Sequence, residues 1–276
     1  MAKRDRTNLP ATIANRIKAG RGQGLGADYR PWLTVQDVPS QGLATRILGY
    51  KTRRVHHLLS KLETDFFCLL EFSPEVSDIR EQFPLLALDE TQAIAEACDV
   101  RHPTDPKSQA AVVMTTDFVI TRLRQGKPEE VARTIKYSQE LEGKRTLEKL
   151  EIERRYWQSR QVDWGIVTEK EIPPVLVQNC RFLRDYLELS EKNLQNHEIE
   201  TLSKVLTEKV KQPTAILRSM ALDCDRQLGF VEGTSLAVAY HLIATRQWQI
   251  DWQLPLEPGK PLNLLSCQTA DAGGAA

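Results

Sequence analysis

Two strand-like segments joined by a short turn constrain the fold of this 276-residue chain more than any other feature. Residues 112–121 and 130–137 are rich in β-branched and aromatic side chains, and the connecting sequence RLRQGKPE contains a glycine and a proline. This pattern predicts an antiparallel β-hairpin. Each strand carries a charge among apolar neighbours, Asp117 in the first and Lys136 in the second. Charged side chains are rarely buried unless they are paired or coordinated, so both residues need an explanation.

A third unexpected charge lies upstream, in a segment with helical periodicity. Apolar residues recur at spacings of three and four over residues 58–70, and Glu63 shares their face. Because strand side chains alternate, Thr134 and Lys136 point to one face, which can also hold Asp117 if the hairpin pairs as expected. Glu63 would then converge with them in an α/β core. The alternative for Glu63 is a residue at the edge of the core that reaches solvent.

Two carboxylates and one ammonium suit metal-dependent hydrolysis of a phosphodiester. Carboxylate oxygens hold Mg²⁺, which neutralises phosphate charge and acidifies a bound water. The lysine can orient or deprotonate that water and offset the charge that develops in the transition state. The order Glu, Asp, X-x-Lys is the pattern of the restriction-endonuclease fold, although its spacing alone has low specificity. A satisfied Asp117–Lys136 ion pair without a catalytic role is the alternative interpretation.

The other expected elements indicate two domains. Helices over residues 10–20 and 140–161, extended residues 77–88 and a short strand at 162–167 predict an α/β domain over residues 1–167. Residues 89–110 are polar, and RHPTDPKS at residues 101–108 is expected to be a loop.

The C-terminal part is predicted to be mainly helical. Helices followed by a strand pair predict a helical, winged-helix-like domain over residues 168–265, which binds DNA or protein. The last residues, 266–276, are rich in glycine and alanine and are expected to be a disordered tail or a linker to a fused partner. The expected helices cover residues 175–187, 193–211, 214–228 and 235–245.

Charge is unevenly distributed along the chain. Residues 1–61 carry 12 Lys and Arg against 3 Asp and Glu, whereas the remaining residues carry 25 against 34. This asymmetry suggests a nucleic-acid-facing portion, with a solvated basic arm as the alternative. The glycine-rich sequence GRGQGLG at residues 20–26 lacks a following GKS or GKT, so a mobile loop near DNA is expected rather than a nucleotide site.

Cysteine spacing and hydropathy exclude several other classes of protein. The five cysteines are widely spaced without a CxxC pair, which argues against a zinc site or a disulfide framework. No apolar run approaches the roughly 20 residues that cross a bilayer. The basic N-terminus lacks the apolar core of a signal peptide, so a cytoplasmic location is expected.

Four sequence blocks in this order resemble the TnsA endonuclease family. They are GRGQGLGADYRPWLTVQDVPS, RRVHHLLSKLE, DIREQFPL and RTLEKLEIERRYW. The resemblance covers roughly residues 10–170 densely and the C-terminal part more thinly. It implies a restriction-endonuclease-like N-terminal domain with Glu63, Asp117 and Lys136 at the catalytic positions.

The resemblance also implies a cofactor and partners. We expect Mg²⁺, for which Mn²⁺ can substitute, held by Glu63, Asp117 and the carbonyl of Ile135. The substrate is double-stranded DNA at the transposon ends, cut on the non-transferred strand at each 5′ end. Expected partners are a TnsB-type transposase, which cuts and joins the 3′ ends, and a TnsC-type AAA+ regulator that docks on the C-terminal portion.

One position departs from the family pattern. Thr134 stands where the family often has Gln, which puts the number of metals and their affinity in doubt. One of Glu148, Glu151 and Glu153 could complete an outer shell, with a solvated helix face as the alternative for each.

Basic residues that lead into the metal-bearing helix are expected to contact DNA phosphates and to position the duplex. Two other functions remain open, namely an assembly subunit with a weakened nuclease site and a free-standing restriction or repair nuclease. The expected DNA contacts are Arg46, Lys51, Arg53, Arg54, His56 and His57.

Overall fold

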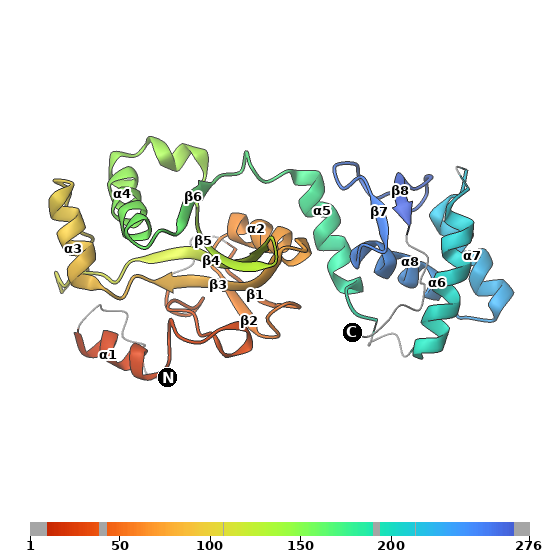
Figure 1. The fold of residues 1–276 in the computed structure, drawn as a ribbon, viewed down its shortest axis with the longest axis horizontal. Helices are drawn as coiled ribbons and strands as arrows, with labels where there is room; N and C mark the ends of the chain where they lie inside the picture. The colour runs from red at the N-terminus through yellow and green to blue at the C-terminus, as the bar shows by residue number, and fades with distance from the viewer. Residues whose placement is uncertain (1–9, 39–42, 107, 190–193, 213, 268–276) are drawn as a thin grey trace. The chain divides into compact units, whose positions relative to one another are not determined.

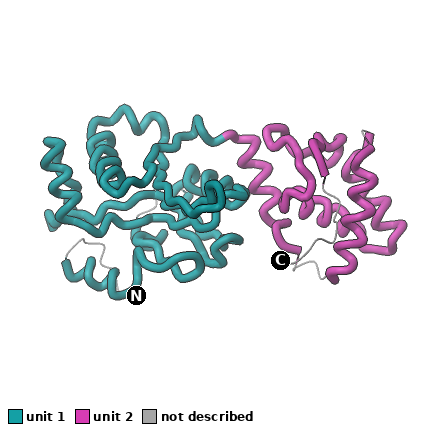
Figure 2. Tube along the Cα trace, in the orientation of Figure 1, with its two compact units in different colours: residues 1–172 teal, residues 173–276 magenta. Residues whose placement is uncertain are grey.

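The computed structural model describes residues 10–38, 43–106, 108–189, 194–212 and 214–267 (Figure 1). The chain divides into two compact units, residues 1–172 and 173–276 (Figure 2). The boundary lies just after the buried Ile172, and in the turn before it Glu171 accepts hydrogen bonds from the N–H and the hydroxyl of Thr168. No helix in the described part of the chain is long and apolar enough to cross a bilayer.

A four-stranded sheet in the order β3-β4-β5-β6 forms the centre of the first unit. β3 pairs antiparallel with β4, β4 antiparallel with β5, and β5 parallel with β6. A separate antiparallel pair is formed by β1 (Thr45–Leu48) and β2 (Val55–Leu58). The strands of the main sheet are β3 (Val76–Pro84), β4 (Thr115–Arg124), β5 (Lys127–Ile135) and β6 (Asp163–Val167).

The predicted hairpin is confirmed, but its turn is much shorter than expected. Arg124 pairs directly with Lys127, so only Gln125 and Gly126 form the turn. Both have left-handed φ angles, 52° and 75°, which is the twist that a two-residue hairpin turn requires. The polar sequence on either side of the turn therefore extends the two strands, and Lys136 lies just beyond the end of β5.

Helices cover both faces of this sheet. α4 (Lys144–Ser159) packs Ile152 and Trp157 against Val119 and Ala132 of the hairpin. On the other face, α2 (Lys61–Phe72) places Phe66 edge-on against Phe118, with ring centroids 5.6 Å apart.

The helix over residues 140–161 is shorter than expected, because its first turn is a 3-10 helix, η2 (Ser138–Glu142), that ends at Gly143. α3 (Leu88–Ala97) lies largely within the polar residues 89–110, where no helix was predicted, and it ends before the expected loop at residues 101–108. Its Ala95 joins the core cluster that contains the α4 side chains, and this burial stabilises an otherwise polar helix.

The glycine-rich segment that follows α1 (Pro10–Lys18) is packed against β3, so the expectation of a mobile loop is wrong. Gly22 has a φ of 74°, and a Cβ there would lie 2.2 Å from Cγ of Pro84. Tyr29 Oη donates to the carbonyl of Glu81 at 3.0 Å, and the Trp32 N–H donates to the carbonyl of Gln82 at 3.1 Å. A short 3-10 turn, η1 (Gly26–Asp28), lies within this segment.

The second unit is helical, with one small antiparallel strand pair. Its buried side chains include Leu206 and Trp248, and the Trp248 indole donates to Thr207 Oγ1 at 3.0 Å. Asp225 caps α8 by accepting the N–H groups of Gly233 and Ser235, so the cap comes from the preceding helix. The elements are α5 (Pro174–Leu183), η3 (Arg184–Tyr186), α6 (Asn196–Val210), α7 (Leu217–Leu228), α8 (Thr234–Ala244), β7 (Trp248–Ile250) and β8 (Leu264–Cys267).

The expected tail begins two residues too early. Ser266 and Cys267 belong to β8, where they pair with Gln249 and Trp248 of β7. Because their backbones pair with β7, these two residues are part of the second unit and not of a tail. The rest of the expected tail, residues 268–276, lies outside the described residues.

Candidate active site

Asp117 and Lys136 lie together at the end of the central hairpin. Asp117 Oδ2 accepts the N–H of Ile135 at 2.7 Å and the Lys136 ammonium at 3.1 Å. The same ammonium donates to the carbonyl of Ile135 at 2.8 Å. Burial alone would lower the pKa of Lys136, but the Asp117 carboxylate raises it above its ordinary range, so this side chain is charged.

Glu63 is buried, with 6% of its surface exposed, so the solvent-reaching alternative is wrong. It lies in the first turn of α2, whose N-cap residue Ser60 accepts the Glu63 N–H. Glu63 Oε2 accepts the Leu59 N–H at 2.9 Å and the Gln82 side-chain amide at 3.2 Å. Burial and the negative charge of Asp117 raise the pKa of Glu63 to about 7.

Glu153 is the carboxylate of α4 that reaches the site. It is 3% exposed, and its Oε1 accepts hydrogen bonds from the hydroxyls of Thr116 and Thr134. Trp164 Nε1 donates to the same oxygen at 3.1 Å. Thr134 therefore points its hydroxyl at a neighbouring carboxylate.

The other two glutamates considered on this helix are paired at the surface. Glu148 forms an ion pair with Arg145 at 2.8 Å, and Glu151 accepts from Arg154 and Arg155. Of the three glutamates, only Glu153 is buried, so the alternative of a solvated helix face does not hold for it. The signal for it was present, since Leu150, Glu153 and Trp157 share one helical face.

A pocket of about 330 Å³ brings much of this chemistry to one place. Asp117, Thr134, Lys136 and Glu153 line it, together with apolar residues such as Met114 and Leu150. A concave site with a few convergent polar groups is typical of catalytic pockets.

The oxygen atoms around Lys136 fit a hard divalent cation. Within the described residues, no three His, Cys, Asp or Glu side chains form a metal-binding group. The ammonium of Lys136 already lies between Asp117 Oδ2 and the Ile135 carbonyl, two of the three predicted ligands. These positions attract positive charge, and carboxylate and carbonyl oxygens are the ligands that Mg²⁺ prefers.

Two of the six residues expected to contact DNA are buried, so that part of the prediction is wrong. Arg54 donates from Nη1 and Nη2 to Glu81 at 2.9 and 2.6 Å, and Nη2 also donates to the Ile79 carbonyl. His56 is fully buried, with Nδ1 2.7 Å from Glu81 Oε2 and Nε2 2.7 Å from Thr52 Oγ1. Strand alternation in β2 turns His56 inward, which a count of charges does not reveal.

The other four lie nearer the surface. Lys51 donates to the carbonyl of Val76 at 2.7 Å, and His57 is half-buried beside the N–H of Val35. Burial also lowers the pKa of His57. Arg46 and Arg53 are exposed.

A cation-lined hollow adjoins the active-site pocket and was not expected from the sequence. It measures about 400 Å³, and both hollows include Pro103 and Lys149 in their walls. Arg101, Arg145 and Lys149 line it, and none of its described lining residues is acidic. We use the name basic hollow for this feature.

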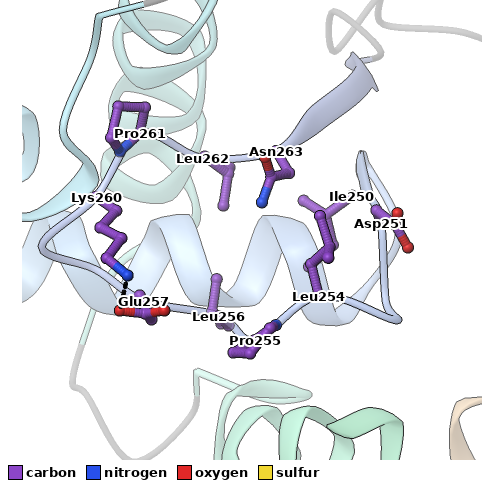
Figure 3. Close-up of a pocket in the computed structure, with 10 residues that line it drawn as sticks. All are labelled: Ile250, Asp251, Leu254, Pro255, Leu256, Glu257, Lys260, Pro261, Leu262 and Asn263. Atoms are coloured by element: carbon purple, nitrogen blue, oxygen red, sulfur yellow. Dashed lines mark ion pairs between the residues drawn. The ribbon is translucent and has the colours of Figure 1, made fainter.

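A larger pocket in the second unit, of about 450 Å³, has a different character (Figure 3). Leu254, Leu256 and Leu262 supply much of its wall. Its only ion pair among the drawn residues joins Glu257 and Lys260 at 2.8 Å. Apart from Asp251, the charged side chains of this pocket pair with each other, whereas the pocket in the first unit brings together Asp117, Lys136 and Glu153 and is the candidate for catalysis.

Replacing Glu153 by glutamine is expected to stabilise the protein at pH 8. Burial raises the pKa of Glu153 from 4.5 to about 7, so the native state resists its ionisation, and this cost grows as pH rises from 4.5 through 7. The difference corresponds to about 3 kcal/mol. Urea denaturation of wild type and Glu153→Gln at pH 5 and pH 8 measures it. An equal stability difference at both pH values would contradict the prediction.

Comparisons with known proteins give two family matches along the chain. A family described as TnsA-like endonuclease N terminal matches residues 73–169, which include Asp117, Lys136 and Glu153. A second, described as TnsA endonuclease C terminal, matches residues 171–252.

A protein of Escherichia coli named transposon Tn7 transposition protein TnsA is 50% identical to this chain over 183 residues. That alignment covers 66% of this chain and 66% of the relative, which is slightly less than two thirds of its length. The two family matches follow one another along both structural units. The chain therefore belongs to the TnsA endonuclease family.

Proposed function

We propose that this protein is a metal-dependent DNA endonuclease that works as a transposase subunit. It hydrolyses the non-transferred strand at the 5′ ends of the transposon. The observation that carries the proposal is the contact of one ammonium, that of Lys136, with both Asp117 and the Ile135 carbonyl. Family membership supports the same reaction class.

Glu63, Asp117 and the Ile135 carbonyl would hold the metal. When bound, Mg²⁺ or Mn²⁺ supplies positive charge to the phosphate and makes a water more acidic. The Ile135 N–H fixes Asp117 Oδ2, so this carboxylate keeps its orientation when the ammonium moves away.

Lys136 has the main electrostatic role among the residues of this chain. Its charged ammonium donates hydrogen bonds to the scissile phosphate or to the attacking water, and offsets negative charge that develops on the phosphate oxygens. Thr134 does not need to be a ligand in this arrangement, because its hydroxyl binds Glu153. The buried Glu153 in turn holds the wall of the pocket through Thr116 and Trp164.

The fold proposals follow from the same elements. The mixed sheet with helices on both faces and acidic residues at one end supports a restriction-endonuclease-like first unit. Helices α5–α8 with the β7–β8 pair support a winged-helix-like second unit. That unit would dock a TnsC-type regulator, while a TnsB-type transposase cuts and joins the 3′ ends.

The DNA backbone would cross the basic hollow next to the scissile phosphate. Its cations can neutralise phosphates beyond the cleavage point, and the exposed Arg46 and Arg53 would contact the duplex elsewhere. Lys149 is the best single probe, because it lines both hollows and has no ion-pair partner among the described side chains.

Lys149→Ala is therefore expected to weaken duplex binding and to lower the slope of log affinity against log salt by about one. Lys127→Ala is the matched control, since this exposed lysine lies at the opposite end of the hairpin, about 23 Å along β4 from Asp117. Fluorescence anisotropy with labelled duplex at several salt concentrations measures both. Equal slopes for the two variants would contradict the proposal that DNA phosphates lie in the basic hollow.

Strand-specific cleavage of end-labelled transposon DNA tests the proposed function. We expect 5′-end nicks only when Mg²⁺ and the two partner proteins are present. Nicking of naked DNA by this chain alone would favour a free-standing nuclease. Normal 3′-end joining without any 5′-end nick would favour an assembly subunit with a weakened nuclease site.

A further inference from the structure

Gln82 has an unusual backbone conformation inside the central sheet. It lies within β3, yet its φ is +48°, a left-handed angle that residues other than glycine rarely adopt. The pairing of β3 with β4 joins Glu81 to Phe118 and then Phe83 to Thr116, and it passes over Gln82 and the Asp117 that lies opposite. The irregularity in β3 thus occurs next to the candidate catalytic aspartate.

The surrounding chain holds Gln82 in this conformation. The Trp32 N–H donates to its carbonyl at 3.1 Å, and Tyr29 Oη donates to the adjacent Glu81 carbonyl. Gly22 lies against Pro84, two residues further along β3. Backbone strain of this kind costs on the order of 1–3 kcal/mol and persists where the neighbourhood fixes it, commonly at functional sites.

The left-handed turn directs the buried Gln82 side chain to α2. Only 2% of Gln82 is exposed, and its Nε2 donates to Glu63 Oε2 at 3.2 Å. The Leu59 N–H donates to the same oxygen at 2.9 Å. Both donors therefore fix Oε2 of the Glu63 carboxylate, and the Ser60 side chain is a further hydrogen-bond partner of this group.

We propose that Gln82 is a positioning residue that orients Glu63 for divalent-cation binding. The inference rests on the proposed metal-dependent function, but it concerns a residue that touches neither DNA nor the reacting atoms. A group that donates a hydrogen bond to a metal-binding carboxylate holds this carboxylate in the orientation that the metal needs. Loss of such a donor lowers metal affinity or activity by about 10- to 100-fold. The glycine-rich segment contributes to this arrangement, because its Gly22 packs against Pro84 of β3, the strand that carries Gln82.

Two substitutions separate the side-chain amide from the backbone conformation. Gln82→Leu keeps the approximate volume and removes the amide, whereas Gln82→Gly removes the amide and tolerates the positive φ without strain. Gln161→Gly is the matched control, because Gln161 also has a left-handed φ, 56°, but is exposed at the end of α4. Full-length proteins are titrated with Mn²⁺ by calorimetry, and 5′-end nicking is followed with the partners present.

We expect Gln82→Leu and Gln82→Gly to weaken Mn²⁺ binding by about 10- to 100-fold. The Mn²⁺ midpoint for nicking should rise in parallel, and the control should match wild type. Wild-type Mn²⁺ affinity in Gln82→Gly would overturn the positioning role, because this variant tolerates the backbone conformation and has no amide to donate to Glu63. Wild-type protein that neither binds Mn²⁺ nor nicks DNA would instead overturn the proposed function itself.

Discussion

Replacing Lys136 by methionine is expected to lower the rate of 5′-end nicking by about 100- to 1,000-fold, the usual cost of removing one preorganised electrostatic donor. Methionine keeps the apolar stem of the side chain and removes the ammonium that contacts Asp117 and the Ile135 carbonyl. The rate is measured on end-labelled DNA with saturating Mg²⁺ and both proposed partners.

A mainly structural ion pair predicts a different result. Lys136→Met would then leave the nicking rate unchanged and lower stability, because Asp117 would lose its cation. Arg133→Met is the control, since Arg133 lies on β5 three residues before Lys136 and pairs with Asp163, whose side chain is 53% exposed. It should nick at close to the wild-type rate.

Removing the Glu81 carboxylate is expected to destabilise the protein by about 3–5 kcal/mol, the range for breaking one side of a buried ion pair. Glu81 is fully buried and accepts hydrogen bonds from Arg54, His56 and the His57 N–H. Glu81→Ala leaves the Arg54 guanidinium buried without its carboxylate. Urea denaturation of the full chain at pH 7 measures the loss.

The effect has a defined pH dependence. Burial alone would raise the pKa of Glu81, but attraction by His56 and Arg54 lowers it from 4.5 to about 2. The stabilisation is therefore fully present above pH 4.5 and is lost as pH falls through about 2. Glu129→Ala is the control, because its ion pair with Arg122 is partly exposed and should contribute no more than about 1 kcal/mol. Equal losses in both variants would contradict the account of this buried cluster.

Local pattern was enough to predict the hairpin and to single out the charged residues of the candidate site. The alternation of the two strands and their turn residues predicted the hairpin, and the charges of Asp117 and Lys136 stood out against apolar neighbours. Glu63 stood out for the same reason on its helical face. Each of these signals lies within one element, where periodicity alone assigns the face of a side chain.

Features that depend on contacts between distant segments were missed. Arg54 and His56 looked like DNA contacts because Glu81, their partner, lies 25 or more residues further along the chain. The left-handed conformation of Gln82 depends on Trp32, since glutamine itself does not favour positive φ. α3 had a local signal in its acidic first turn, Asp89 and Glu90, and the high polarity of the segment obscured it.

The most direct test compares wild type and Asp117→Ala in strand-specific cleavage of DNA that carries transposon ends. The transposase and regulator are present, and both reactions contain Mg²⁺. We expect Asp117→Ala to lose the 5′-end nicks and to retain 3′-end joining, because only this chain's carboxylate has been removed. Equal 5′-end cleavage by the two proteins would contradict it and leave Asp117 with a structural role.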